Sequence, residues 1–432
     1  MPGKASIISP AKRNRAEKQK LPGYTAPVVA LVAVNFFMAD VRDGLGPYLA
    51  AFLQVHGWST ADIGMMLTFG GIIGMLATSP AGALVDAIHA KRSLMVAASL
   101  LVSASCLLLL WRTDYIIVGL SQIAMPLAGA VIPPAIAGIS LGMVGQAGFD
   151  RQLGRNEAAN HGGNVFGAAL SGGGTWLFGI IGVLFVQIAM AVAAITATLS
   201  ISPGAIDHAR ARGQRSDGQK AMGFGALLRN PPLVMFAFTM ACFHLGNAAM
   251  LPMVGLRLGA EGGGSVGVWL SAAIIIAQLT MIPMAILTAR IAAKSGYRNI
   301  VIAALLVLPV RGAIAAALPP LWSIIPVQIL DGIGAGLLGV ATPGFVARIL
   351  HGSGRFNAGL GGVMTLQGVG AALSPTIGGW IAQEMGYPMA FGVLGAIAVV
   401  AIPIFLLIRT AAYGQADVAP AAAADLAPGR GP

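Results

Sequence analysis

Long apolar runs recur along this chain, each bounded by charged or turn residues, and they limit its possible folds more than any other feature. A helix needs about 20 mainly apolar residues to cross the hydrocarbon core of a bilayer. Cutting the sequence at its charges and turns gives twelve runs of this length. With 56% hydrophobic and only 9% charged residues, the chain has too little polar surface to cover a soluble globule. We therefore predict an all-α integral membrane protein.

The twelve predicted transmembrane helices form two groups of six, separated by a polar linker. Glycine and proline are frequent within them, which suits closely packed membrane helices. The predicted spans lie near residues 25–53, 60–85, 93–111, 115–143, 158–177, 180–202, 231–256, 265–289, 299–318, 321–347, 357–382 and 388–409.

An offset of 206 positions aligns the first group of spans with the second. The basic turn that contains Arg92 then falls on the turn that contains Arg298, and both turns lie between apolar runs. At the same offset Gln122 and the isoleucine after it fall on Gln328 and its isoleucine, and small residues follow each pair. Two agreements at one offset predict a duplicated chain with two pseudo-symmetric six-helix bundles.

Five segments follow from this division. The first tail is basic, which predicts contact with anionic lipid headgroups, and it is not expected to be a cleavable signal peptide because the apolar run after it is long. We expect a basic cytoplasmic tail over 1–24, an N-terminal six-helix bundle over 25–202, a cytoplasmic linker over 203–230, a C-terminal six-helix bundle over 231–410 and a disordered tail over 411–432.

The 26 Lys and Arg residues are distributed unevenly between the two predicted sides of the membrane. If the N-terminus is cytoplasmic, most of them fall in cytoplasmic tails, loops and linker. Arg112 and Arg257 then fall on the other side, and Arg42 and Arg311 lie within spans. Because basic residues accumulate on the cytoplasmic side, we expect both termini in the cytoplasm and a location in the bacterial inner membrane. The net charge of +11 then requires no nucleic-acid partner.

The charged turn between the second and third spans carries a pattern. Gly82 is followed four positions later by Asp86, and the turn ends in Lys91 and Arg92. This pattern resembles the loop signature of the major facilitator superfamily of secondary transporters. The resemblance implies that these four residues, with Arg298 in the second half, hold helix ends together and gate the cytoplasmic mouth. A simple positive-inside loop would explain Lys91 and Arg92, but not Asp86 at the end of the preceding span.

Two further signatures of that family are altered here. Gln122, and Gln328 in the duplicate, stand where the helix-4 signature of the family has an arginine. An antiporter-type glycine and proline signature has its better copy between Gly370 and Gly379, in the eleventh span. Small-residue stretches of this kind are helix-packing faces first, so they are weak evidence for export over import.

Charged groups inside lipid are costly unless they are paired or face water, so each one is a candidate functional residue. The first span holds Asp40, Arg42 and Asp43 beside a Gly-Pro break, and its counterpart in the seventh span holds His244 and Asn247. The resemblance implies that spans 1, 4, 7 and 10 line a central cavity.

The tenth span contributes Asp331, whose carboxylate is expected to face those of the first span. A desolvated carboxylate near like charge can bind and release protons near neutral pH. The structural alternative is that one aspartate of the first span neutralises Arg42, and that Arg311 in the ninth span serves Asp331. We predict substrate or proton contacts at Asp40, Arg42, Asp43, His244, Asn247, Gln328 and Asp331.

The sequence predicts a secondary transporter that moves a small organic molecule by alternating access, coupled to protons, with efflux as the first choice of direction. Import of an anionic metabolite through Arg42, and uniport, are alternatives. A membrane-embedded enzyme or sensor is a remote alternative, because the polar groups are scattered singly in both halves and the polar segments are short.

No cofactor or metal is expected, and the chain is not expected to be an enzyme. The sequence has no phosphate-binding Gly-Lys-Ser/Thr loop and no His-Glu-x-x-His motif. The two cysteines, Cys106 and Cys242, lie in apolar runs and suggest neither a disulfide nor a metal site. We expect a monomer whose partners are its substrate, protons and the lipid bilayer.

Overall fold

The computed structural model describes residues 26–43, 45–207, 230–262, 264–350 and 356–408. The two predicted tails and most of the predicted linker lie outside these residues. The helices are α2 (Ala26–Asp43), α3 (Gly46–Val55), α4 (Thr60–Ala87), α5 (Lys91–Trp111), α6 (Tyr115–Phe178), η1 (Gly179–Ile181), α7 (Gly182–Ser200), η2 (Pro203–Ala205), α10 (Pro231–Asn247), α11 (Met250–Ala260), α12 (Val266–Ser295), α13 (Arg298–Ala317), α14 (Pro320–Ile349), α15 (Phe356–Met385) and α16 (Tyr387–Leu406).

Nine stretches of the described residues are long and apolar enough to cross a membrane. The stretch Gln152–Ser200 among them contains two predicted spans, which meet at Gly179, where φ is 71°. Two more predicted spans are helical but are not among the nine: the first, which is broken into α2 and α3, and the glycine-rich α15. Within the described residues, all twelve predicted spans are therefore mainly helical.

The first and seventh spans are interrupted at corresponding places. In the first span α2 ends at Asp43 and α3 begins at Gly46, and in the seventh α10 ends at Asn247 and α11 begins at Met250. Pro47 lies in the first turn of α3, where backbone N–H groups have no acceptor within the helix, so a residue without an N–H loses no hydrogen bond there. The break predicted from the Gly-Pro pair is confirmed, and the second half repeats it.

The residues between the predicted fourth and fifth spans are helical apart from one kink. Both spans belong to α6, in which two helices meet at a kink at Gly145. Gly145 has φ 65° and ψ 177°, a backbone conformation that glycine adopts without steric penalty. The first apolar stretch ends at this kink, and the next begins at Gln152, one short helical segment further on.

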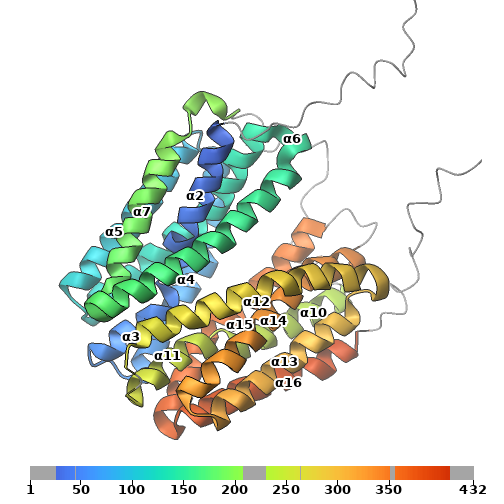
Figure 1. The fold of residues 1–432 in the computed structure, drawn as a ribbon. Helices are drawn as coiled ribbons and strands as arrows, with labels where there is room; N and C mark the ends of the chain where they lie inside the picture. Colours follow the sequence, from blue (N-terminus) through green and yellow to red (C-terminus); the bar gives the residue numbers. More distant parts are fainter. Residues whose placement is uncertain (1–25, 44, 208–229, 263, 351–355, 409–432) are drawn as a thin grey trace, which may run out of the picture.

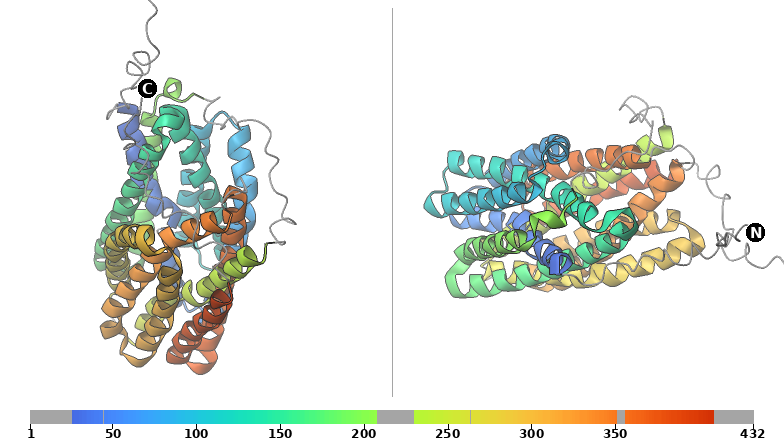
Figure 2. Two further views of the ribbon diagram at one scale, coloured as in Figure 1. Left: turned by 90° about the vertical axis from the view of Figure 1, so that its right-hand side faces the viewer. Right: turned by 90° about the horizontal axis from the view of Figure 1, so that it is seen from above.

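Helices α2–α7 pack together as one bundle and α10–α16 as a second, as Figures 1 and 2 show. The most extensive contacts between the bundles are those of α3 with α11, α4 with α15, and α6 with α12; α3 and η1 also touch α12. Glycines allow the close approach of α4 and α15. A Cβ atom on Gly64 would lie 2.3 Å from the carbonyl oxygen of Pro375, and one on Gly379 would lie 2.6 Å from that of Thr60.

The two ends of the molecule differ. At the end where α3 and α11 finish and α4, α12 and α16 begin, which we call the sealed end, the bundles lie side by side (Figure 1). They diverge towards the opposite end, where α5, α10 and α13 begin, which we call the linker end.

Each bundle has the same arginine contact at the linker end. The Arg92 guanidinium, at the start of α5, donates to the carbonyl oxygens of Thr198 (3.3 Å) and Leu199 (3.0 Å), where α7 finishes. Arg298, at the start of α13, donates to the carbonyl oxygen of Leu406 (3.4 Å), where α16 finishes. The predicted duplication therefore extends to individual hydrogen bonds.

Candidate functional site

An ion pair lies in the core of the C-terminal bundle. Nη1 of Arg311, on α13, lies 2.6 Å from Oδ1 of Asp331, on α14. The same nitrogen donates to Oδ1 of Asn247 at 2.6 Å. Three helices therefore contribute to one polar cluster, which we call the Arg311 cluster.

The local sequence explains how the Arg311 cluster forms. Asn247 is the last residue of α10, immediately before the break in the seventh span. The Arg311 side chain is only 1% exposed, whereas that of Asp331 is 21% exposed. Because a buried charge needs a partner, Arg311 pairs with the carboxylate of Asp331. Asp331 is the more exposed member of this ion pair.

The Arg311 cluster has unused hydrogen-bonding capacity nearby. Nε of Arg311 is buried without a hydrogen-bond partner among the described residues. Gln328, one helical turn before Asp331 on α14, is fully buried, and neither of its amide atoms has a partner within the described part of the chain. His244 is half-buried on α10, and its Nδ1 lies 3.0 Å from the carbonyl oxygen of Met240.

The predicted site residues of the first span lie in the N-terminal bundle. Asp40 is 4% exposed and packs against α6, where a Cβ atom on Gly167 would lie 2.3 Å from its Oδ1. Arg42 is exposed and passes beside Gly129, also on α6. Asp43 ends α2, and its side chain lies outside the described residues.

Asp40 and Asp331 each contact helices of their own bundle: Asp40 contacts α6, and Asp331 contacts α13. Arg311 binds Asp331 from the neighbouring helix. That the carboxylates of the two halves face one another stays a prediction.

The predicted gating residues lie at the linker end. Lys91 is 1% exposed, and its ammonium group donates to the carbonyl oxygens of Val85 and Ile88, so it caps the C-terminus of α4. Gly82 and Asp86 lie in the last turns of α4, and the side chain of Asp86 is outside the described residues.

Sequence reasoning gave Arg311 only a supporting role. The sequence did carry a signal for Arg311, because it places a charged guanidinium within an apolar span. A charge inside the membrane is as costly for an arginine as for the aspartates predicted as site residues. A groove of about 460 Å³ lies between α4, α5 and α6, and it is lined by apolar side chains and by none of the predicted site residues.

Comparisons with known proteins agree with this architecture. The sequence profile of the Major Facilitator Superfamily matches residues 31–310 and 270–428. Two proteins of Mycobacterium tuberculosis, from strains CDC 1551 / Oshkosh and ATCC 25618 / H37Rv, are each named an uncharacterized MFS-type transporter. Each is 40% identical to this chain over 374 residues, which covers 85% of this chain and 90% of the relative.

Solved transporters share the fold. The nucleoside transporter NupG gives a TM-score of 0.75 at 14% identity, over 89% of this chain and 99% of NupG. A bacterial homolog of the human lysosomal transporter Spinster, in an inward-facing and unoccupied conformation, gives a TM-score of 0.68 at 14% identity, over 88% of this chain and 96% of that one. With the profile match and the relatives, these findings identify the chain as a member of the major facilitator superfamily, an integral membrane transporter and not an enzyme.

Proposed function

We propose that the protein is a proton-coupled secondary transporter that moves a small organic molecule by alternating access. It works as a monomer in the bacterial inner membrane, with both termini in the cytoplasm. The basic residues Lys91, Arg92 and Arg298 at the linker end support this orientation, since such residues accumulate on the cytoplasmic side. In this orientation the bundles are in contact at the outer side and diverge towards the cytoplasm.

The observation that carries the proposal is the Arg311 cluster. A carboxylate inside a membrane protein is costly, and such groups commonly bind protons or substrates. Asp331 is paired with Arg311, yet its side chain keeps 21% exposure, which supports a role in proton binding. Protonation of Asp331 releases Arg311 from its charged partner, which couples the occupancy of one group to the state of the other.

The charge balance of the Arg311 cluster limits the substrate class. The pair of Arg311 and Asp331 has no net charge, and a cation that binds Asp331 is repelled by the guanidinium beside it. A neutral molecule that hydrogen-bonds to Asn247 meets no such barrier. We therefore assign neutral organic molecules as the first substrate class.

Efflux is the direction that we propose first, on the antiporter-type sequence of the eleventh span. Within α15 its glycines pack against neighbouring backbones, as at Gly379 beside Thr60. The second candidate is import of an anion together with a proton, and the burial of Arg311 favours it. When Asp331 is protonated, an anion beside Arg311 restores a neutral cluster.

The gating role that we propose belongs to the linker end. Lys91 holds the end of α4, and Arg92 and Arg298 hold α7 and α16 at the ends of their bundles. Gly82 and Asp86 lie in the same helix end as the carbonyl groups that Lys91 binds. These contacts join helix ends within each bundle, and they support gating in which the helix ends of one bundle move together at the linker end.

Proteoliposomes test the proposed function. Internal pH is recorded while panels of neutral, anionic and cationic organic compounds are added, for the wild type, Asp331→Asn and the conservative control Asp331→Glu. We expect a compound to drive proton movement in the wild type and in Asp331→Glu, and none in Asp331→Asn. Substrate exchange that is identical in all three proteins, without proton movement, would reduce the protein to a uniporter.

The same experiment separates the two directions. Proton movement opposite to the substrate identifies antiport, as efflux requires. Movement of a proton with an anionic substrate identifies the import candidate, and its loss in Arg311→Gln would assign the anion contact to Arg311.

A further inference from the structure

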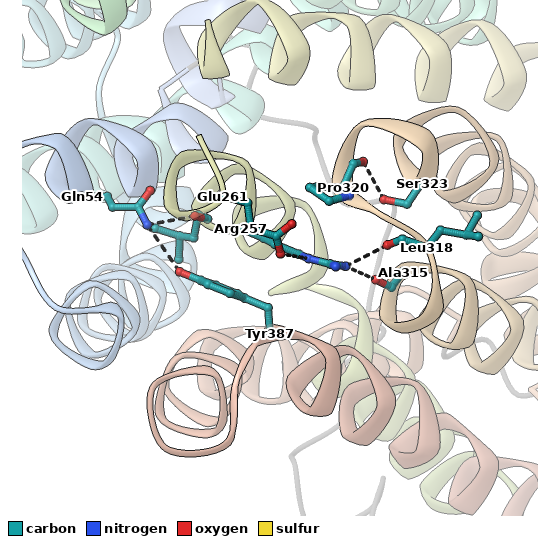
Figure 3. Close-up of polar contacts among 9 residues, drawn as sticks. Gln54, Arg257, Glu261, Ala315, Leu318, Pro320, Ser323 and Tyr387 are labelled. Carbon is teal, nitrogen blue, oxygen red and sulfur yellow. Dashed lines mark hydrogen bonds and ion pairs between the residues drawn. The ribbon is translucent and has the colours of Figure 1, made fainter. Parts of the chain in front are cut away.

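A group of hydrogen bonds joins the two bundles at the sealed end. Gln54, near the end of α3, donates through Nε2 to the carbonyl oxygen of Leu256 on α11 at 2.9 Å. The same Nε2 lies 3.4 Å from the hydroxyl of Tyr387, the first residue of α16. Figure 3 shows the Gln54 amide directed towards Tyr387. One side chain of the N-terminal bundle therefore binds two helices of the C-terminal bundle.

Two neighbouring contacts also cross between the bundles. Oγ1 of Thr60, at the start of α4, lies 3.3 Å from the Tyr387 hydroxyl. The amide of Ala61 donates to Oε1 of Gln383 at 3.0 Å, near the end of α15. The starts of α4 and α16 and the ends of α3, α11 and α15 are thus connected through polar groups.

Arg257 holds the C-terminal side of this network in place. Its Nε donates to Glu261 at 2.7 Å, and its Nη1 donates to the carbonyl oxygens of Ala315 (2.6 Å) and Leu318 (3.1 Å), where α13 finishes (Figure 3). These bonds fix the end of α11 against α13. The neighbouring Leu256 carbonyl is therefore held where Gln54 reaches it.

The space beside these bonds is small. A cavity of only about 10 Å³ remains between α4, α11 and α15, with Ile63, Leu67, Met253 and Pro375 in its lining. That volume holds about one water molecule and no substrate. Thr60 and Leu256, which take part in these polar contacts, also line this small cavity.

We infer that Gln54, Thr60, Gln383 and Tyr387 form a polar latch that opens in each transport cycle and sets the fraction of time for which the sealed end is shut. The inference rests on the alternating access proposed above. Gln54, Thr60 and Tyr387 are half-buried, and Gln383 is exposed. When the bundles separate, water can replace each lost bond, so the latch opens at a modest cost.

Thiol labelling tests the latch. Met253, which is 2% exposed, is replaced by cysteine in a chain that also carries Cys106→Ala and Cys242→Ala. A charged, membrane-impermeant thiol reagent is then applied from the outer side. We expect Tyr387→Phe and Gln54→Leu each to raise the labelling rate, by about fivefold for each hydrogen bond lost.

A matched control lies in the same region. The Ser323 hydroxyl donates to the carbonyl oxygen of Pro320 at 2.8 Å, within one helix (Figure 3). Ser323→Ala removes a hydrogen bond at the sealed end without touching the contact between bundles, and we expect no change in labelling. A second reporter, Met95→Cys inside the N-terminal bundle, is fully buried and should stay unlabelled unless a variant unfolds.

The outcomes separate the latch from the proposed function. Equal labelling of Met253→Cys in the wild type, Tyr387→Phe and Gln54→Leu would overturn the latch, whatever the protein transports. If labelling rises as expected but no panel compound drives proton movement in the wild type, the latch stands and the proton-coupled function fails. Labelling of both reporters in a latch variant would mean unfolding and would also overturn the inference.

Discussion

Arg311 carries a positive charge in the interior of the C-terminal bundle, where it is 1% exposed. Its two partners, Asp331 and Asn247, both bind through Nη1. Removing one member of a buried ion pair leaves the other charge uncompensated, which costs far more than the pair itself contributes. The stability of this bundle therefore depends on keeping both charges or neither.

The first prediction concerns this pair. Asp331→Asn is expected to destabilise the protein by about 3–5 kcal/mol, because Arg311 loses its counter-charge. The double variant Arg311→Met with Asp331→Asn should recover most of that loss, since neither charge remains. Apparent melting temperatures in detergent measure both. Equal melting temperatures for the single and double variants would show that the two charges are not coupled.

The second prediction concerns Lys91, the only other charged side chain with 1% exposure among the described residues. Lys91→Met should destabilise the protein by about 1.5–3 kcal/mol, because the carbonyl oxygens of Val85 and Ile88 lose a charged donor. Lys294→Met, at an exposed position at the end of α12, is the control. Similar melting temperatures for the two variants would contradict the capping role.

The candidate site could be predicted in part from single residues. The cost of a charge in lipid singled out Asp331 and Asp40 correctly as polar positions inside helices. Their partners depend on how each helix is rotated about its axis, which the sequence does not specify. Arg42, beside the first-span aspartates in sequence, is exposed, whereas Arg311 from another helix binds Asp331.

At the scale of the helix, the contact between α4 and α15 depends on glycine. The backbone of α4 approaches Gly379 so closely that a Cβ atom there would lie 2.6 Å from the carbonyl oxygen of Thr60. A backbone atom cannot move aside as a flexible side chain does. The close approach of α4 and α15 at the sealed end therefore requires glycine at position 379.

The third prediction compares two glycines of α15. Gly379→Ala should weaken the contact with α4 and raise outer-side labelling of Met253→Cys several-fold, because the helices must move apart. Gly361→Ala, where a Cβ atom would meet nothing within 4 Å, should leave labelling unchanged and stabilise the helix by up to about 1 kcal/mol. The idea is wrong if both variants label alike.

Helix positions followed from the apolar runs, but the passage from the fourth to the fifth span did not. Cutting the sequence at charged and turn residues leaves a gap between these two predicted spans. In the structure this gap is helical, and polar residues on either side of the kink at Gly145 are hydrogen-bonded: Gln152 donates to Asn156 at 2.8 Å, and Asn156 donates to Ser140 at 2.8 Å. Polarity alone cannot distinguish a loop from a hydrogen-bonded helix contact, because the partner lies in the other span.

For the whole molecule, the distribution of basic residues agrees with a cytoplasmic linker end better than the sequence alone suggested. Arg112 and Arg257 were the two exceptions to a cytoplasmic location, and both have a structural use at the sealed end. Arg257 binds the carbonyl groups where α13 finishes. Arg112 stacks on Trp111, with its guanidinium carbon 5.2 Å from the ring centroid. Neither therefore contradicts a cytoplasmic linker end.

The fourth prediction tests that orientation. A green fluorescent protein fused after residue 432 should fluoresce in bacteria, and alkaline phosphatase at the same place should be inactive, because that enzyme needs the oxidising periplasm. The reverse pattern should appear for fusions to a chain truncated within the sealed-end turn between α11 and α12. An active phosphatase at the C-terminus would invert the orientation and place the latch on the cytoplasmic side.

The paired arginine contacts at the linker end also bear on the history of the chain. Arg92 binds the end of α7 and Arg298 binds the end of α16, so an ancestral half would already have had its own closing contact before the gene was duplicated. The interiors of the two bundles do not repeat one another in the same way: Asp40 packs on a glycine in one, and Arg311 pairs with Asp331 in the other.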